Sequence, residues 1–244
     1  MNFINKKILN TPFPLLISDI SNDFLNKENE STICDEILEL KQEKETEMVM
    51  GGRYRYLKNF FLKKNLCRQI FDYFNKQSTF NYLFNEIYMA SNKFKLKDEY
   101  NIFIKKKFVI SNRVNKLLPF FYKKKFYLDM DFSIAEKNYF REPHHDKRTR
   151  ILSFLLYLNT TDIKSGGSLE IYEYKNKKKN YKDRFPKKDE LNLFTKIKPE
   201  FGKFISFLSS PDSIHGVENF NPINNEKRIF LYGSYTSFHN VEWL

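Results

Sequence analysis

Two of the four histidines in this 244-residue sequence lie in the short motif Glu142-Pro-His-His-Asp-Lys. In an extended segment, residues i and i+2 project from the same face, so His144 and Asp146 should point together and His145 away from them. An imidazole and a carboxylate on one face could form part of a metal site. Taken alone, a His-X-Asp pattern is also common in surface loops.

A third ligand would have to come from a distant part of the chain. The best candidate is His215, which follows the apolar run 204–208 in the segment Ser209-Ser-Pro-Asp-Ser-Ile-His-Gly-Val. Two imidazoles and one carboxylate suit Fe(II), and they leave three coordination positions open for a bidentate keto acid and O₂. We therefore expect His144, Asp146 and His215 to hold Fe(II), with His145 and His239 as bystanders.

A basic residue downstream would complete such a site. Arg228 lies thirteen residues after His215 and opens the predicted strand Arg228-Ile-Phe-Leu-Tyr-Gly-Ser-Tyr. A guanidinium inside a β-barrel is costly unless it meets a carboxylate, and the distal carboxylate of 2-oxoglutarate would be that partner. The alternative is a surface arginine at the entrance of the strand.

The second half of the chain must supply the scaffold, because its hydrophobic pattern has the period of β-strands. Alternation over Phe126–Phe132 predicts a half-buried strand, and the nearly continuous apolar run Arg150–Asn159 predicts a strand buried on both faces. Such strands without intervening helices indicate a sandwich or barrel. Three more strands are predicted at Ser168–Tyr174, Lys203–Ser209 and Lys227–Ser237.

The first half has mostly helical periodicity. Apolar residues spaced by three and four predict helices around 33–40, 62–74 and 80–87, the first capped by Ser31 or Thr32. The segment Pro12–Ile20 should be extended, and 91–125 fits neither period. We expect one domain over 1–244: a mostly helical support region, 1–125, and a β core, 126–244. The Lys-rich segment 175–199 is predicted to be an insertion, either a solvated hairpin or a lid over the site.

Composition limits the classes of protein. The net charge of +12 suggests a polyanionic partner, but lysine outnumbers arginine more than threefold and Asn, Ile, Phe and Tyr are abundant. That profile is typical of an AT-rich genome, and nucleic-acid binders more often carry arginine clusters. Cys34 and Cys67 show no metal or disulfide spacing, and no signal or membrane-spanning stretch is present. We expect a cytoplasmic protein that binds neither membrane nor nucleic acid.

Six segments in order resemble the catalytic core of the Fe(II)/2-oxoglutarate-dependent dioxygenases, especially the prolyl-4-hydroxylase-like branch, over about 126–237. They are Pro143-His-His-Asp, Arg150-Ile-Leu-Ser-Phe-Leu-Leu-Tyr-Leu-Asn, Ser165-Gly-Gly-Ser-Leu-Glu-Ile-Tyr, Phe201-Gly-Lys-Phe-Ile-Ser-Phe, Ser213-Ile-His-Gly-Val and Lys227-Arg-Ile-Phe-Leu. The resemblance implies a mainly β fold with N-terminal helices and a double-stranded β-helix (jelly-roll) core.

The resemblance also assigns roles to residues. The iron ligands are His144, Asp146 and His215, and Arg228 and Tyr157 hold the C5 carboxylate of 2-oxoglutarate. Tyr139 is a further cosubstrate-binding candidate, with an ordinary barrel aromatic as the alternative. The implied reaction uses Fe(II), 2-oxoglutarate and O₂, releases succinate and CO₂, and hydroxylates an unactivated C–H bond. A carboxylate ligand at Asp146 favours hydroxylation over halogenation.

The primary substrate does not follow from these motifs. The resemblance points to a peptidyl proline, while relatives that act on small molecules or nucleic acid share the same residues. Three alternatives remain outside peptidyl hydroxylation: a non-redox cupin-type metal-binding barrel, a catalytically silent binding domain, and a 2-oxoglutarate oxygenase for a small molecule or nucleic acid. Arg228 argues against the first, since a cupin needs no buried cation for a keto acid.

Overall fold

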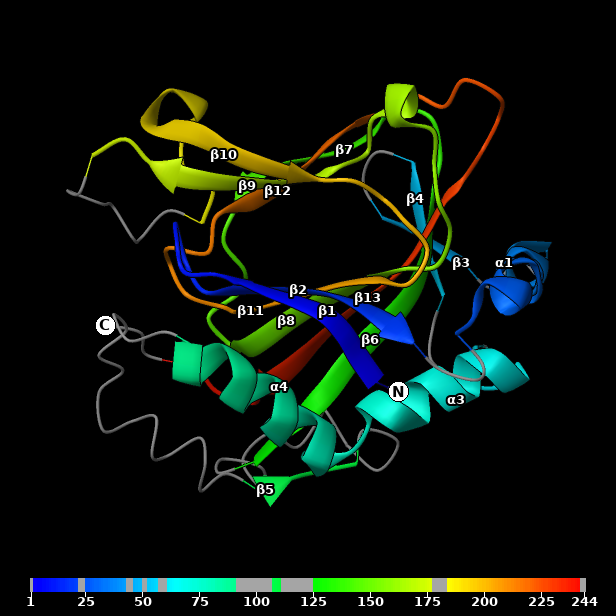
Figure 1. Ribbon diagram of the computed structural model, residues 1–244, viewed down its shortest axis with the longest axis horizontal. Helices are drawn as coiled ribbons and strands as arrows, with labels where there is room; N and C mark the ends of the chain where they lie inside the picture. Colours follow the sequence, from blue (N-terminus) through cyan, green and yellow to red (C-terminus); the bar gives the residue numbers. More distant parts are fainter. Residues whose placement is uncertain are drawn as a thin grey trace.

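Two antiparallel β-sheets face each other and form the centre of the structure, a computed structural model (Figure 1). The structure describes residues 2–21, 25–42, 46–49, 52–56, 61–90, 107–110, 125–176 and 184–241. Side chains from the inner faces of both sheets meet between the layers, as in a jelly roll.

The larger sheet has nine strands, one of which, β5, pairs in parallel with β6 off the main path. Strand β8 is buried over nearly its whole length because both of its faces are covered, which explains its continuous apolar sequence. In spatial order the strands are β1 (Asn2–Leu9), β2 (Leu15–Ser21), β11 (Lys203–Leu208), β8 (Arg150–Tyr157), β13 (Arg228–Ser237), β6 (Lys125–Ala135), β4 (Arg53–Tyr56) and β3 (Thr46–Val49), with β5 at Lys107–Phe108.

The smaller sheet has four strands in the order β10 (Leu191–Ile197), β9 (Leu169–Tyr174), β12 (His215–Phe220) and β7 (Tyr139–His144). Strands β7 and β12, which carry two of the predicted metal ligands, are therefore neighbours. Their pairing is irregular, with register shifts after His215 and after Val217.

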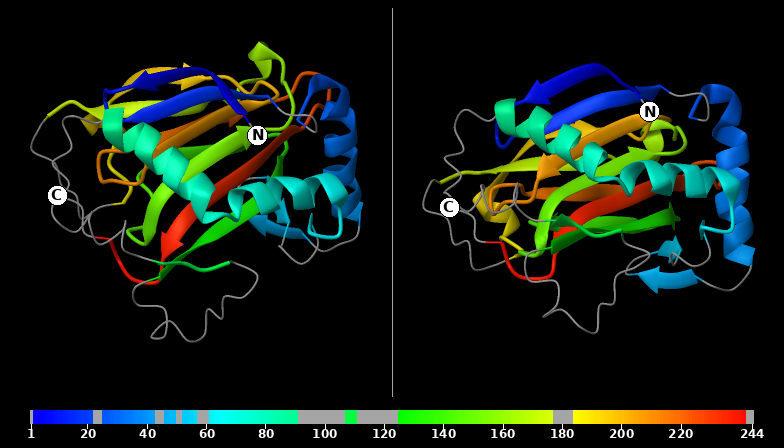
Figure 2. Two further views of the ribbon diagram at one scale, coloured as in Figure 1. Left: turned by 60° about the horizontal axis from the view of Figure 1, so that its bottom comes forward. Right: turned by 90° about the horizontal axis from the view of Figure 1, so that it is seen from below.

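Helices α3 (Asn65–Phe74) and α4 (Gln77–Ala90) cover the outer face of the larger sheet, and α1 (Glu30–Gln42) lies beside it (Figure 2). Aromatic rings fill this layer: Phe74 stacks on Phe154 and Phe204, with centroids 4.6 and 5.8 Å away. The Tyr235 hydroxyl donates a 2.7 Å hydrogen bond to the Phe74 carbonyl. Short 3₁₀ turns lie at Lys27–Asn29, Ile163–Ser165 and Lys188–Glu190. No helix in the described ranges has the length and apolar character to cross a bilayer.

Most elements agree with the periodicity of the sequence. All five predicted strands of the second half are present, and Pro12–Ile20 leads into β2. The three predicted helices are present as well. Helix α1 begins at Glu30, directly after a 3₁₀ turn whose cap is Asn26, so the prediction of a Ser31 or Thr32 cap is wrong.

Two regions contain more strand than the sequence suggested. The N-terminal half contributes β1–β4 to the larger sheet, so its helices are only part of the support. Within 175–199, strand β10 pairs with β9, with a register shift between Leu193 and Thr195, and the excursion is therefore shorter than predicted. Residues 91–106 and 111–124 lie outside the described residues. The division at 125/126 stays a prediction.

Candidate active site

The three predicted metal ligands converge at one end of the smaller sheet. His144 is the last residue of β7, His215 is the first of β12, and the two are direct cross-strand partners with ring centroids 4.5 Å apart. Asp146 follows two residues after His144. One ligand atom from each of the three lies within 4.8 Å of the other two, and all three residues are buried. Sheet register therefore brings together His144 and His215, which are 71 residues apart in sequence.

Backbone carbonyls orient both imidazole rings. His144 Nδ1 lies 2.8 Å from the carbonyl oxygen of Glu142, and His215 Nδ1 lies 2.9 Å from that of Ser213. A carbonyl can only accept, so each Nδ1 must carry the proton and each Nε2 must hold the lone pair. This is the arrangement by which proteins fix histidine tautomers for metal binding.

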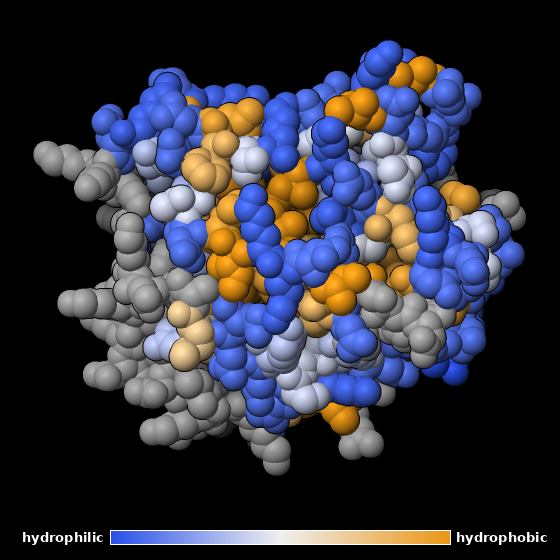
Figure 3. All heavy atoms as spheres, viewed as in Figure 1, coloured by the Kyte–Doolittle hydropathy of each residue, from blue (hydrophilic) through white to orange (hydrophobic). Residues whose placement is uncertain are grey.

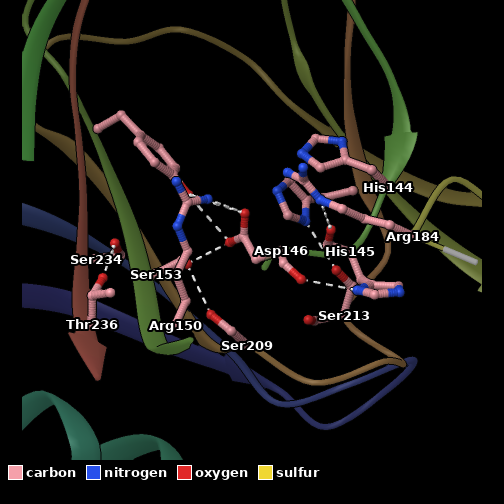
Figure 4. A network of polar contacts seen from close by, with 12 residues as sticks. His144, His145, Asp146, Arg150, Ser153, Arg184, Ser209, Ser213, Ser234 and Thr236 are labelled. Carbon is pink, nitrogen blue, oxygen red and sulfur yellow. Dashed lines mark hydrogen bonds and ion pairs between the residues drawn. The ribbon is translucent and has the colours of Figure 1, made fainter. Parts of the chain in front are cut away.

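Three side chains hold the carboxylate of Asp146 (Figure 4). Arg150 Nη1 donates to Oδ1 in an ion pair, and Ser153 Oγ donates to Oδ2 at 2.5 Å. The Tyr232 hydroxyl lies 3.2 Å from both oxygens and accepts a hydrogen bond from Arg150. In Figure 4, Asp146 lies between Arg150 on one side and His144 and Arg184 on the other.

The protonation states suit a metal ion. Burial, with a smaller contribution from neighbouring His215, lowers the pKa of His144 to about 3, and burial also lowers the pKa of His215. Burial alone would raise the pKa of Asp146, but Arg150 and the two imidazoles hold it well below its usual range. At neutral pH the site therefore presents two neutral imidazoles and one carboxylate, which are the ligand forms that divalent metals require.

Arg228 lies fully buried at the start of β13 and lines the same cavity as His144 and His215. Its Nη2 donates one hydrogen bond, of 3.3 Å, to the Tyr157 hydroxyl, while Nε and Nη1 have no partner within the described residues. The guanidinium also lies over the rings of Phe230 and Tyr139, at 4.3 and 5.8 Å from their centroids. A buried cation with unsatisfied donors is costly unless an anion binds it, so this arrangement fits a ligand carboxylate.

Gly166 and Gly167 form the turn before β9 with φ of +71° and +76°, a conformation that favours glycine. A Cβ on Gly167 would lie 2.9 Å from the Phe220 ring and 3.1 Å from Cδ of Arg228. The pair thus makes a tight turn, and it also leaves room for the stem of Arg228.

A cavity of about 690 Å³ between the two layers connects these groups. His144 and His215 line one part of it, and Tyr139, Arg228 and Phe230 line another. On the face drawn in Figure 3, hydrophobic surface is visible near the centre, partly covered by hydrophilic side chains. The volume exceeds that of a five-carbon dicarboxylate and leaves room for a second molecule.

Several residues of the site were not predicted. Arg150 was interpreted only as the start of an apolar strand and Tyr232 only as part of β13, yet both contact Asp146. Arg184, near the end of the Lys-rich segment, contacts the ligand motif directly: its carbonyl accepts from the His145 amide and its Nε donates to the His145 carbonyl, both at 3.1 Å. The spacing of Asp146 and Arg150 was the one signal in the sequence that could have indicated a pair.

The fold and the constellation of two histidines, an aspartate and a buried arginine define a 2-oxoglutarate-dependent oxygenase. The sequence model of the 2OG-Fe(II) oxygenase superfamily matches residues 130–233, a range that contains all these side chains. The match covers less than half of the chain, and it supports a 2-oxoglutarate-dependent dioxygenase that uses Fe(II), 2-oxoglutarate and O₂. No curated protein matches the sequence.

Solved structures show the same fold at low sequence identity. A Pseudomonas putida prolyl-4-hydroxylase is 15% identical with a TM-score of 0.51, and the alignment covers 91% of this chain and 92% of that one. A Phytophthora capsici prolyl 4-hydroxylase is 12% identical with a TM-score of 0.52, covering 91% and 58%. The epimerase SnoN, solved with Fe³⁺, α-ketoglutarate and a nogalamycin, is 10% identical with a TM-score of 0.51, covering 91% and 78%.

Proposed function

We propose that His144, Asp146 and His215 bind Fe(II), and that Arg228 with Tyr157 binds the C5 carboxylate of 2-oxoglutarate. The observation that carries the proposal is the buried Arg228, whose Nε and Nη1 have no partner in the described part of the chain although it shares a cavity with the metal-ligand cluster. The donor set fits a mononuclear Fe(II) site with three open positions.

The remaining residues of the site orient these groups. Arg150, Ser153 and Tyr232 fix the Asp146 carboxylate, leaving its other lone pairs for the metal. When bound, Fe(II), 2-oxoglutarate and O₂ would supply the oxidative decarboxylation that yields succinate, CO₂ and an oxidant for a substrate C–H bond. Tyr139 stacks with Phe230 and lies beside Arg228, so we assign it to the wall around the cosubstrate.

The primary substrate is a protein or a small molecule in this proposal. The fold alone does not distinguish them, because structures named prolyl hydroxylases and an antibiotic-pathway epimerase have nearly equal similarity to this chain. Peptidyl proline therefore stays one candidate, and the site gives no argument for nucleic acid. We expect the chain to act in the cytoplasm.

The test is an anaerobic titration of metal-free protein with Fe(II) and then 2-oxoglutarate, followed by visible absorption. A weak charge-transfer band should form in the unaltered protein and in His239→Ala, an exposed histidine outside the site, and should be absent in His215→Ala. Aerobic succinate release should follow the same order. Tight binding of zinc or manganese with no band for iron and 2-oxoglutarate would favour the non-redox cupin-type alternative.

A further inference from the structure

Arginine is strongly concentrated in the cavity of this lysine-rich protein. Nine of the 42 basic residues are arginines, yet six of the seven basic residues that line the cavity within the described ranges are arginines. Lys147 is the seventh. The six are Arg53, Arg55, Arg141, Arg150, Arg184 and Arg228.

The overall charge of the protein does not explain this partition. A compositional preference for lysine acts wherever the two cations are interchangeable, which is the case on most of the surface. Arginine differs in its planar fork of donors, which binds carboxylate and phosphate in a bidentate way, and in its weaker hydration. Arginines retained in one cavity therefore indicate contacts that lysine cannot make.

Three of the six arginines have an assigned anionic partner. Arg53 pairs with Asp131 at 2.5 Å, Arg150 pairs with Asp146, and Arg228 is assigned to 2-oxoglutarate. The other carboxylate of the lining is Asp129. Within the described residues the lining therefore has seven Lys and Arg side chains and two carboxylates, Asp129 and Asp131.

Two of the arginines contact one exposed aromatic ring next to the metal ligands. The guanidinium carbons of Arg141 and Arg184 are 5.9 and 5.2 Å from the centroid of Phe185, and that ring stacks on His144 at 5.8 Å. The two hydrogen bonds between Arg184 and the His145 backbone fix this cluster to the ligand motif. No acceptor within the described residues contacts Nη1 or Nη2 of Arg184.

We infer that the primary substrate carries an anionic group, a carboxylate or a phosphate, which Arg141 and Arg184 bind beside the metal centre. The inference rests on the proposed function and adds the chemical class of the substrate. Like charges brought together in a partly buried cavity repel one another, and an anion between them removes that repulsion. Burial lowers the pKa of Arg184, and nearby Arg150 and Arg141 lower it further against the opposing effect of Asp146.

The inference is tested by calorimetric binding of two matched probe pairs to the anaerobic Fe(II)–2-oxoglutarate complex, benzoate against benzamide and phenyl phosphate against phenol. The visible band confirms that the complex is loaded in each sample. At least one anion should bind tenfold or more tightly than its neutral match, the scale of a charge-assisted hydrogen bond. The preference should shrink at 0.5 M salt, and the stronger pair shows whether the group is a carboxylate or a phosphate.

Variants decide where the anion binds. Arg184→Gln and Arg141→Gln should each reduce the preference about tenfold, while Arg148→Gln, an exposed arginine outside the cavity, should retain it. Arg184→Lys keeps the charge without the fork, and should retain only part of the preference. Equal binding of anions and neutral probes, or a preference unchanged in both Gln variants, would overturn the inference alone. Absence of the band in unaltered protein would overturn the proposed function and, with it, this inference.

Discussion

Replacing Arg228 with methionine should stabilise the metal-free protein and abolish cosubstrate binding, two effects of opposite sign from one residue. The side chain is fully buried, and two of its donor nitrogens have no partner within the described residues. Each unsatisfied buried donor costs about 1–3 kcal/mol, and apolar replacement of buried charges often stabilises by about 1–4 kcal/mol. The replacement loses the 3.3 Å hydrogen bond to Tyr157 and the cation–π contacts with Phe230 and Tyr139, and we expect the removal of the unsatisfied charge to outweigh these losses and raise the free energy of unfolding by about 1–4 kcal/mol.

The loss of binding follows from the same contacts. A bidentate charge-assisted pair contributes roughly 3 kcal/mol or more, which corresponds to about a hundredfold in the Kd for 2-oxoglutarate. Urea unfolding of metal-free protein measures the first effect and anaerobic absorption titration the second. Arg148→Met, an exposed position, should change either quantity little. The reasoning is refuted if Arg228→Met unfolds at lower urea while 2-oxoglutarate binds as before.

Three further predictions concern the metal ligands and the turn beside them. Asp146→Ala should lower the free energy of unfolding of metal-free protein by up to about 3 kcal/mol because the partly buried Arg150 loses its carboxylate, and adding Arg150→Met should restore much of it; urea unfolding of both variants tests this. Burial lowers the pKa of His144 to about 3, so the unfolded chain binds more protons than the folded one between pH 6.5 and 3. The metal-free protein should therefore lose up to about 1.4 kcal/mol per pH unit as pH falls through that window, and unfolding curves of His144→Gln should show a shallower slope. Gly167→Ala should destabilise by about 1–3 kcal/mol more than Gly202→Ala in thermal unfolding, because both have positive φ but only Gly167 would place a Cβ within 2.9 Å of a neighbour; equal effects would contradict the packing argument.

Local patterns in the sequence were sufficient to predict five strands of the second half and to select the residues of the metal-ligand cluster. Alternation and continuous apolar runs depend on which face of a strand is buried, and this information lies within each segment. In the ligand motif, His144 and Asp146 are separated by two positions, and this spacing in an extended segment assigns both side chains to one face. His215 could be chosen only because few histidines compete for the role.

The remaining features depend on packing that the sequence does not encode locally. Strand β1 is mostly exposed, so it lacks the alternation of apolar and polar residues that marks a half-buried strand. Strand β10 is also mostly exposed and lies in a Lys-rich segment, so its sequence shows no clear strand pattern. Tyr232 contacts Asp146 from a strand 86 residues away. The arginine cluster likewise combines β7, β8, β13 and the segment before β10, and only the folded cavity shows that its members are neighbours.

The position of β7 at the edge of the four-stranded sheet has a consequence for the durability of the metal centre. In the described part of the chain, β12 is the one strand paired with β7, and that pairing is irregular. A metal ion bound by both His144 and His215 would hold β7 to β12 in addition to the backbone hydrogen bonds between these strands. Opening of the edge and release of the ion should then be one linked event, so that amide exchange in β7 slows as the metal concentration rises.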